Sequence, residues 1–251
     1  MSGHSHWATI KRKKGAGDAK RGQVFTKLAK EITLAAREGG DPTMNFKLRI
    51  CVDKARSNNM PKDSIDRAIK RGTGESKDGF VFEDVMYEGY GPKGVAFIIE
   101  CVTENKNRTV AEVRHALSRS GGSLGESGSV AWQFSRKAYF LISGEKLDFD
   151  KVFELGLEKG ADDVQETEDG IEVFAGVENF KALSDAFYAA NLPISEAEIR
   201  YFPNQEMDLS TEETLQVLRV VDSLEELDDV QQVYHNLNVS DEAMAALEGE
   251  E

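Results

Sequence analysis

The sequence of 251 residues predicts an α+β protein of three domains: a basic N-terminal helical bundle and then two α/β sandwich domains, the second of them ferredoxin-like and inserted in the first. Three observations predict this fold. Helical periodicity dominates from about residue 23 to residue 72, and strand patterns begin at residue 80. Residues 138–203 then alternate as β-α-β-β-α-β, the order of a ferredoxin-like sandwich.

Shifts in charge and pattern set the expected domain boundaries. The elements after residue 205 should return to the domain that begins near residue 80, because that domain otherwise has too few elements to cover its sheet. We therefore expect a basic flexible arm (1–22), a helical domain (23–77), an α+β domain (78–135 plus 205–240), an acidic ferredoxin-like domain (136–204) and an acidic tail (241–251).

The helical domain is predicted from apolar residues that recur every three or four positions. Such a stripe runs from Phe25 to Ala36 and indicates a helix over about 23–37. Similar stripes indicate helices over about 44–58 and 61–71. Three basic helices suggest a helix-turn-helix, but the second connection lacks a clear turn signature and the basic residues are spread over all three helices. Base reading in the major groove by one helix is therefore the less favoured alternative.

The next segment is predicted to be a hairpin followed by a helix. The apolar stretches VFEDVMYEGY and GVAFIIECV are separated by turn residues and indicate two paired strands. A helix over about 109–119 is expected to open with a capping box, in which Thr109 and Glu112 satisfy each other's backbone donors. The glycine-rich loop GGSLGESGS then leads into SVAWQF, which has the pattern of a strand.

In the ferredoxin-like segment, the strands AYFLIS, DVQETED, GIEVFAG and ISEAEIRYF alternate with helices over about 148–159 and 177–190. The chain beyond it is expected to form a short strand at MDLS and two amphipathic helices. The apolar residues of these two helices are Leu215, Leu218 and Val221, and then Val230, Val233 and Leu237. We expect the acidic last ten residues to be frayed.

Charge is distributed unevenly along the chain. The formal net charge is -14, yet the first 72 residues hold 17 of the 31 Lys and Arg and only 7 of the 45 Asp and Glu. A basic end on an acidic body indicates a polyanionic partner, with the acidic part limiting indiscriminate binding. The sequence therefore predicts nucleic acid as the partner of the N-terminal region.

The residues expected to contact nucleic acid lie mostly in the arm and the first helix, with two more on the helix after the hairpin. Lysine and arginine side chains gain affinity by displacing counterions from phosphates. The predicted set is Lys11, Arg12, Lys13, Lys14, Lys20, Arg21, Lys27, Lys30, Arg108 and Arg119. For Arg108 and Arg119, a solvated face paired with acidic neighbours is an equal alternative. For Trp7, a stacking contact with a base and packing against the first domain are equally favoured.

Several other classes of protein are disfavoured by the sequence. The two cysteines, Cys51 and Cys101, form no C-x-x-C pair and support neither a disulfide framework nor a zinc site, so buried thiols in a reducing cytoplasm are expected. No apolar run approaches the roughly 20 residues that span a bilayer, so no membrane partner is expected. We also expect no cofactor and no small-molecule substrate.

Two motif matches fail on their context. GYGPKG fits the dinucleotide-binding fingerprint but runs into a strand instead of a helix. The loop around Ser123 fits the G-x-S-x-G of a hydrolase, but it leaves a helix and enters a strand, the reverse of a nucleophile elbow. Copper or nickel binding by Ser2-Gly3-His4 after loss of Met1 remains an outside alternative, because any exposed N-terminal peptide with His in third place offers this ligand set.

Three long stretches of the chain resemble the YebC/PmpR family, which includes the mitochondrial translational activator of cytochrome c oxidase subunit one. They are SGHSHWATIKRKKGAGDAKRGQVFTKLAKEI, NMPKDSIDRAIKRGTG and YEGYGPKGVAFIIECVTENKNRTVAEVRHALSRSGGSLGESGSVAWQF. The departures from the family pattern are His6, Arg12 and Lys93, and together they remove no positive charge.

The resemblance implies a three-domain α+β protein and a cytoplasmic, non-enzymatic regulator of gene expression. Many members of the family are described as probable DNA-binding transcriptional regulators, and others act in translation on the ribosome. Two hypotheses follow: a transcriptional regulator that binds duplex DNA, or a translation factor whose basic arm and helical domain bind ribosomal RNA. The family descriptions favour the first, and the dispersed basic residues slightly favour the second.

Overall fold

The computed structural model describes residues 18–75, 82–144 and 147–249, and the side chains of these except residues 18–20 and 248–249. The chain divides into two compact units, Met1–Phe134 with Pro203–Glu251, and Ser135–Phe202. Each unit contains a four-stranded sheet, so the predicted mixture of helices and sheets is confirmed. Within the described ranges, no helix is both long and apolar enough to cross a lipid bilayer.

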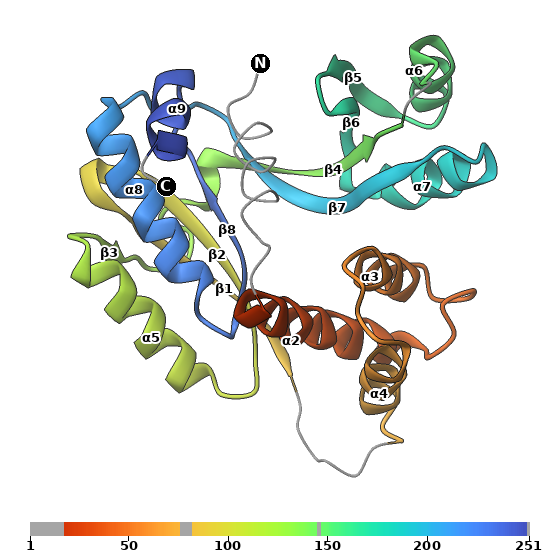
Figure 1. Ribbon diagram of the computed structural model, residues 1–251, viewed down its shortest axis with the longest axis horizontal. Coiled ribbons are helices and arrows are strands. Elements are labelled where there is room, and N and C mark those ends of the chain that lie inside the picture. The colour runs from red at the N-terminus through yellow and green to blue at the C-terminus, as the bar shows by residue number, and fades with distance from the viewer. Residues whose placement is uncertain (1–17, 76–81, 145–146, 250–251) are drawn as a thin grey trace. The chain divides into compact units, whose positions relative to one another are not determined.

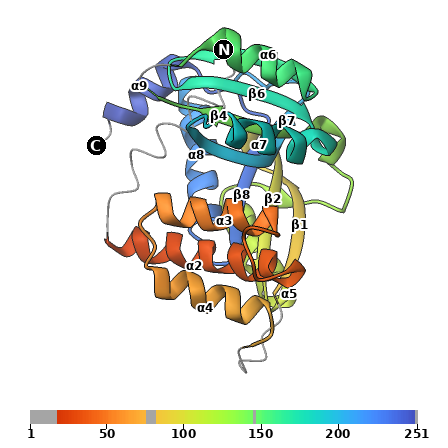
Figure 2. The same ribbon diagram turned by 90° about the vertical axis from the view of Figure 1, so that its right-hand side faces the viewer.

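The first unit begins with three helices, α2 (Asp18–Ala35), α3 (Phe46–Ser57) and α4 (Lys62–Gly72). Helix α2 starts inside the segment that the sequence assigns to the flexible arm. It lies between α3 and α4, as Figure 2 shows. The apolar stripes meet in a shared core of Leu28, Ile32, Leu48, Val52 and Ile65, among others. The three predicted helices are therefore confirmed, with small shifts of their ends.

The same unit holds a sheet of β1 (Glu83–Tyr90), β2 (Ala96–Thr103), β3 (Ser123–Leu124) and β8 (Val230–His235), in the order β3-β1-β2-β8. Helices α5 (Lys106–Arg119) and α8 (Thr211–Glu225) lie along one face of this sheet (Figure 1). Their apolar residues and those of the strands form one core, which includes Phe97, Ile99, Leu117 and Val221. Because β8 pairs with β2, the predicted return of the C-terminal segment to this sheet is confirmed.

The prediction of a second amphipathic helix in the C-terminal segment is wrong, because the residues in question form strand β8. The pairing of β8 with β2 shifts register between Glu100 and Cys101, where Val230 lies opposite Cys101 and Gln232 opposite Glu100. Gln231 is the extra residue of this bulge. A bulge changes the alternation of faces, so Val230 and Val233 are both buried although they are three positions apart. Apolar residues three positions apart also lie on one face of a helix, which explains the wrong prediction.

Three local predictions also need correction. Residues Asp241–Gly249 form helix α9, with Ala243 and Met244 buried, so most of the expected frayed tail is ordered. Helix α5 begins earlier than expected: Asn105 caps it by accepting from the Arg108 N–H, and Thr109 lies inside the helix. The stretch SVAWQF holds a 3-10 turn at Ala131–Gln133 before the next strand starts at Phe134.

The second unit contains, in chain order, β4 (Phe134–Ile142), α6 (Phe149–Glu158), β5 (Ala161–Thr167), β6 (Gly170–Gly176), α7 (Phe180–Ala189) and β7 (Ile194–Pro203). The strands lie in the order β5-β6-β4-β7, the arrangement of a ferredoxin-like sheet. The two helices share a core with the strands through residues such as Phe140, Val152, Val173 and Leu183. The six elements follow in the predicted order.

Candidate nucleic-acid interface

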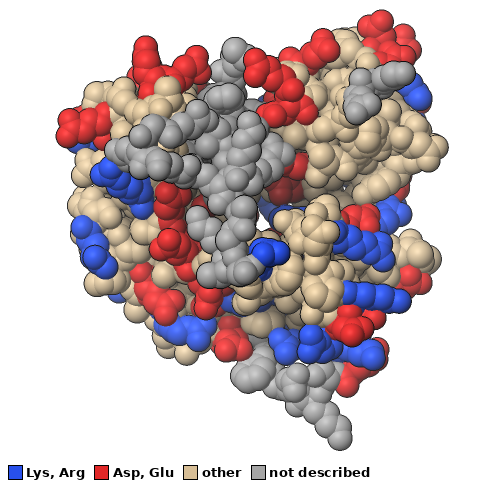
Figure 3. Space-filling view, viewed as in Figure 1, with Lys and Arg blue, Asp and Glu red and all other residues tan. Residues whose placement is uncertain are grey.

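Helices α3 and α4 carry much of the exposed positive charge of the first unit. Figure 3 shows Lys and Arg side chains over these two helices, with some Asp and Glu between them. The exposed basic residues are Lys47, Lys54 and Arg56 on α3 and Lys62, Arg67, Lys70 and Arg71 on α4. The apolar stripes turn inward to the core, so the basic residues are left on the outside.

Some of these basic side chains are engaged by acidic or polar neighbours. The Lys54 ammonium lies 3.3 Å from a Glu31 carboxylate oxygen, and Arg67 donates to the Ser64 hydroxyl at 3.0 Å. By contrast, Lys47, Lys62 and Lys70 make no ion pair with any residue that the structure describes. These three ammonium groups are exposed to solvent. The set predicted from sequence contains no residue of α3 or α4.

The predicted residues of the arm are only partly described. Lys11, Arg12, Lys13 and Lys14 lie outside the described residues, and so does the side chain of Lys20. Arg21 is exposed near the start of α2. Arg21 is therefore the one arm residue of the predicted set whose side chain is described.

Two lysines of the predicted set, together with a glutamine, bind main-chain carbonyls at the end of another helix and just beyond it. Gln23, Lys27 and Lys30 follow one face of α2 and donate hydrogen bonds to main-chain carbonyls of Glu226, Glu225 and Asp228, at 2.5, 2.6 and 2.8 Å. The last carbonyls of a helix lack intrahelical donors and carry the negative end of its dipole. Lys27 and Gln23 satisfy carbonyls at the end of α8, whereas Lys30 binds a carbonyl just beyond it. Their role in this structure is to attach α2 to the α/β part of the unit.

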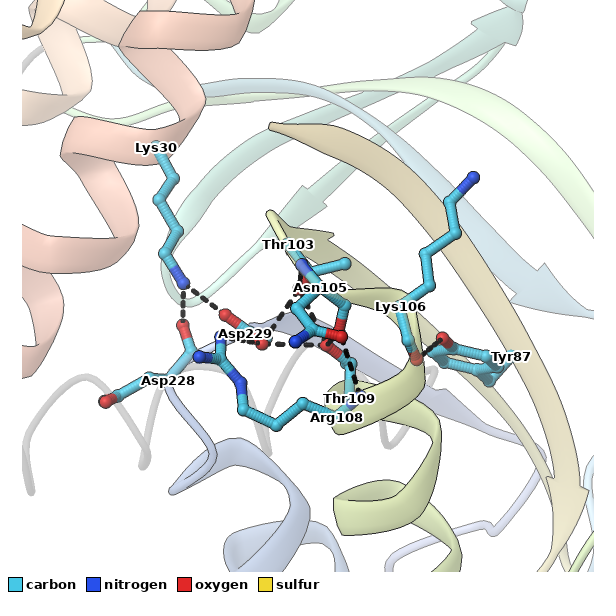
Figure 4. Close-up of polar contacts among 9 residues, drawn as sticks. All are labelled: Lys30, Tyr87, Thr103, Asn105, Lys106, Arg108, Thr109, Asp228 and Asp229. Atoms are coloured by element: carbon cyan, nitrogen blue, oxygen red, sulfur yellow. Dashed lines mark hydrogen bonds and ion pairs between the residues drawn. The ribbon is translucent and has the colours of Figure 1, made fainter. Parts of the chain in front are cut away.

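Asp229 is the centre of a buried polar network that joins three parts of the first unit (Figure 4). Its Oδ1 lies 2.6 Å from the Lys30 ammonium, and its Oδ2 accepts from the Arg108 guanidinium at 2.8 Å. The hydroxyls of Thr103 and Thr109 lie 3.0 and 2.8 Å from the same Oδ2. Thr103 ends β2, Thr109 and Arg108 lie in α5, and Lys30 lies in α2. One carboxylate therefore connects a helix of the N-terminal bundle to a strand and a helix of the α/β part.

The charge of Asp229 is well compensated. Burial raises its pKa, but the hydrogen bonds from Lys30, Arg108 and Thr109 outweigh burial and lower the pKa to about 2. The hydrogen bond to Asp229 raises the pKa of Arg108. The Lys30 side chain is only 11% exposed, whereas that of Arg108 is 46% exposed. Lys30 therefore lies in a buried ion pair and not on the basic surface where it was expected from sequence, while Arg108 keeps part of its surface open.

Arg119 lies beside a surface hollow between α5 and α8. Glu112, His115, Arg219 and Glu226 line the same hollow. Positive and negative side chains are mixed there, which corresponds to the alternative that the sequence left open for this helix face. The surface beside Arg119 therefore carries charges of both signs.

Ser123, Cys51 and Cys101, which the sequence disfavours as a nucleophile and as metal ligands, lie in surroundings that do not activate them. Ser123 lies in the edge strand β3 and pairs with Tyr90, so the backbone around it is not that of a nucleophile elbow. Burial raises the pKa of the free thiols of Cys51 and Cys101 to about 12, which makes both poor nucleophiles at neutral pH. Among the described residues, no group of three or more His, Cys, Asp and Glu is placed to hold a metal ion.

The fold and this surface define a class of protein: a multidomain α+β protein with a basic helical region attached to an α/β body. The comparisons identify the family. Residues 5–75 match the TACO1/YebC protein N-terminal domain, and residues 82–237 match the TACO1/YebC second and third domain. The chain belongs to the TACO1/YebC family.

Relatives in this family match over their whole length. A protein of Geobacter sulfurreducens is 49% identical over 98% of this chain and 100% of its own, and one of Nitrosococcus oceani is 51% identical with the same coverage. Both are named probable transcriptional regulatory protein. The crystal structure of a conserved hypothetical protein from Aquifex aeolicus is similar with a TM-score of 0.78 and 39% identity, covering 88% of this chain and 91% of that one.

Proposed function

We propose that this chain is a non-enzymatic regulator of gene expression that binds nucleic acid through its N-terminal region. The observation that carries the proposal is the exposed positive charge of α3 and α4, including Lys47, Lys62 and Lys70, whose ammonium groups pair with no acidic residue in the described part of the chain. Such groups gain affinity for phosphates by releasing counterions. The family's second and third domains, residues 82–237, would serve as the body on which this basic region is held.

The residues that we propose as phosphate contacts are not the same as the set predicted from sequence. Lys11, Arg12, Lys13, Lys14, Lys20, Arg21 and Arg119 remain proposed contacts. Lys27 and Lys30 become positioning residues, because their ammonium groups hold α2 on the α8 end and on Asp229. Arg108 shares both roles, since its guanidinium binds Asp229 and is partly open to solvent. Lys47, Lys62 and Lys70 are added.

Transcriptional regulation through duplex DNA is the leading form of this function. The names of the relatives support it. Phosphate contacts from several helices would give affinity without base reading, so specificity would come from DNA shape or from dimerisation. We retain the three-domain arrangement, with residues 136–204 inserted in the α+β domain, as part of the proposal.

Translational regulation through ribosomal RNA is the second candidate. It is favoured by one observation: the exposed basic residues are distributed over α3 and α4 and are not concentrated on a single helix that could enter a groove. A dispersed basic surface suits the irregular backbone of folded RNA. The ribosome would then be the partner.

Sedimentation of a cell lysate through a sucrose gradient separates the two forms. The protein should be followed at two salt concentrations, with and without nuclease. Co-migration with ribosomes that salt disrupts would favour translation. A protein that stays at the top of the gradient and shifts duplex promoter fragments in preference to random DNA would favour transcription. Absence of both behaviours would contradict the proposed function.

A further inference from the structure

Trp132 is the most exposed aromatic side chain among the described residues, at 73% of its full surface. Isolated exposed apolar residues are common on proteins, so exposure alone assigns no role. What distinguishes Trp132 is the construction of the segment that carries it, residues 125–133, which we call the Trp132 loop. This loop connects the edge strand β3 to β4.

The buried carboxylate of Glu88 accepts hydrogen bonds from the backbone of the Trp132 loop. The Oε1 of Glu88, on β1, accepts the Gly128 N–H at 2.6 Å, and its Oε2 accepts the N–H groups of Val130 and Ala131, both at 2.8 Å. Burial acts to raise the pKa of Glu88, but the three backbone hydrogen bonds together lower it. The carboxylate is therefore ionised at neutral pH, and hydrogen bonds to it are strong.

Further contacts fix the loop at its middle and its end. The Tyr90 hydroxyl donates to the Ser129 carbonyl at 3.0 Å. The Asn204 side-chain amide donates to the Trp132 carbonyl at 3.1 Å, and the Asn204 N–H donates to the Gln133 carbonyl at 2.8 Å. Val130 is fully buried. The backbone that carries the exposed indole ring is therefore fixed by several hydrogen bonds.

The polar edge of the indole is already satisfied within the loop. Its Nε1–H donates to the Ser129 carbonyl at 3.0 Å. A partner of Trp132 therefore gains little from accepting a hydrogen bond, and the remaining attraction is that of the flat ring. No other residue of the loop has a large exposed apolar side chain, so the loop lacks the contiguous apolar surface of a protein-docking patch.

We propose that Trp132 is a stacking platform for an unpaired base of a single-stranded nucleic acid. The proposal rests on the proposed nucleic-acid binding, and it adds a single-stranded element to the ligand. Every base offers a flat π-face, so a ring without a free donor stacks on bases with little sequence preference. Fixing the ring in advance lowers the entropy lost on binding.

Intrinsic fluorescence tests the contact directly. The chain has two tryptophans, so the full-length Trp7→Phe variant leaves Trp132 as the only indole. This variant is titrated with single-stranded oligouridylate and oligodeoxythymidylate of about 12 nucleotides, a length within the usual site size, and with a DNA duplex of equal length. Stacking predicts saturable quenching by the single strands that follows their binding curve, and no comparable quenching by the duplex.

Affinity gives the second readout, from the anisotropy of a fluorescein-labelled strand. Trp132→Ala should weaken single-strand binding about tenfold, and Trp132→Phe should retain most of it. Phe153→Ala, which removes an exposed aromatic ring from α6, is the matched control and should bind like the wild type. The Trp132 ring is largely outside the core, so both Trp132 variants are expected to fold, and circular dichroism checks the folding of all three variants.

The possible outcomes separate this inference from the proposed function. Unchanged affinity of Trp132→Ala together with unquenched Trp132 emission would overturn the stacking site and leave nucleic-acid binding intact. Absence of binding by the wild type to any of the probes would overturn both. If Trp132→Ala loses a protein partner but keeps its affinity for the oligonucleotides, Trp132 is a protein contact and the inference is wrong.

Discussion

At the scale of single residues, Asp229 explains why two of the predicted phosphate-binding residues have another role. From sequence, Lys30 and Arg108 are simply basic residues in a basic region. In the structure both bind a carboxylate more than a hundred residues away in the chain. Asp229 follows Asp228 in an acidic stretch and has no local feature that marks it as buried. Only the tertiary fold distinguishes these two aspartates: Asp229 is 2% exposed, whereas Asp228 is exposed.

Replacing Asp229 should destabilise the first unit. In Asp229→Asn the side chain keeps its size but loses its charge, which leaves the buried Lys30 ammonium without a counterion. We expect a loss of about 3 kcal/mol in the free energy of unfolding, measured by urea denaturation. Asp228→Asn is the matched control: only its main-chain carbonyl is used, so the change should stay within about 0.5 kcal/mol. Equal effects of the two substitutions would refute the network.

The same carboxylate predicts a pH dependence. The pKa of Asp229 is lowered from 3.8 to about 2 in the folded chain, so its contribution to stability is complete above about pH 4 and disappears as the pH falls through 2. The difference in unfolding free energy between the wild type and Asp229→Asn should therefore shrink by about 2 kcal/mol over that interval. A difference that is constant between these pH values would show that ionisation of Asp229 does not stabilise the fold.

At the scale of elements, the sequence predicts most helices and strands because their apolar periodicity is regular. Strand β8 is the instructive failure. Its bulge at Gln231 places Val230 and Val233 on one face, and the same spacing is read from sequence as helical. The prediction of the α5 cap fails for a different reason. Thr109 matches a capping box, but its hydroxyl is directed to Asp229, and Asn105 caps the helix instead. The bulge cannot be recognised without the partner strand, and the role of the Thr109 hydroxyl cannot be recognised without the Asp229 carboxylate, although Asn105 is itself a residue type that favours the N-cap position.

The packing of α4 against α2 depends on the absence of a side chain at Gly72. A Cβ at this position would lie 2.3 Å from the Thr33 carbonyl oxygen and 2.6 Å from the Ala36 Cβ. Gly72→Ala should therefore cost about 1–3 kcal/mol of stability, measured by thermal or urea unfolding. Gly22→Ala, within α2, meets nothing within 4 Å and should stabilise the helix by up to about 1 kcal/mol. Stabilisation by both substitutions would mean that the two helices pack less closely than described.

At the scale of the whole molecule, the sequence predicts the charge asymmetry and the mixed α/β fold, and the resemblance to the family covers nearly all of the chain. The detailed interface is less predictable, because exposure and pairing of each basic residue depend on the fold. Lys27 and Lys47 have the same chemistry, yet one binds the end of α8 and the other makes no ion pair with the described residues. Positive charge in the sequence thus predicts which region is basic better than it predicts which of its side chains remain unpaired.

The central claim is that the N-terminal region binds the phosphates of nucleic acid, and two variants address it. One replaces Lys47, Lys62 and Lys70 by alanine, and the other replaces Lys11, Arg12, Lys13 and Lys14. The control replaces Lys151, Lys159 and Lys181 of the second unit, which changes the net charge as much as the first variant does.

The most direct measurement is the salt dependence of binding, by fluorescence anisotropy of a labelled duplex and a labelled RNA hairpin. Both N-terminal variants should bind more weakly, and the slope of log affinity against log salt for the duplex should fall by about 0.9 for each phosphate that the variant no longer neutralises. The control should keep the slope of the wild type. Unchanged slopes in both N-terminal variants, or an equal decrease in the control, would contradict binding through this region.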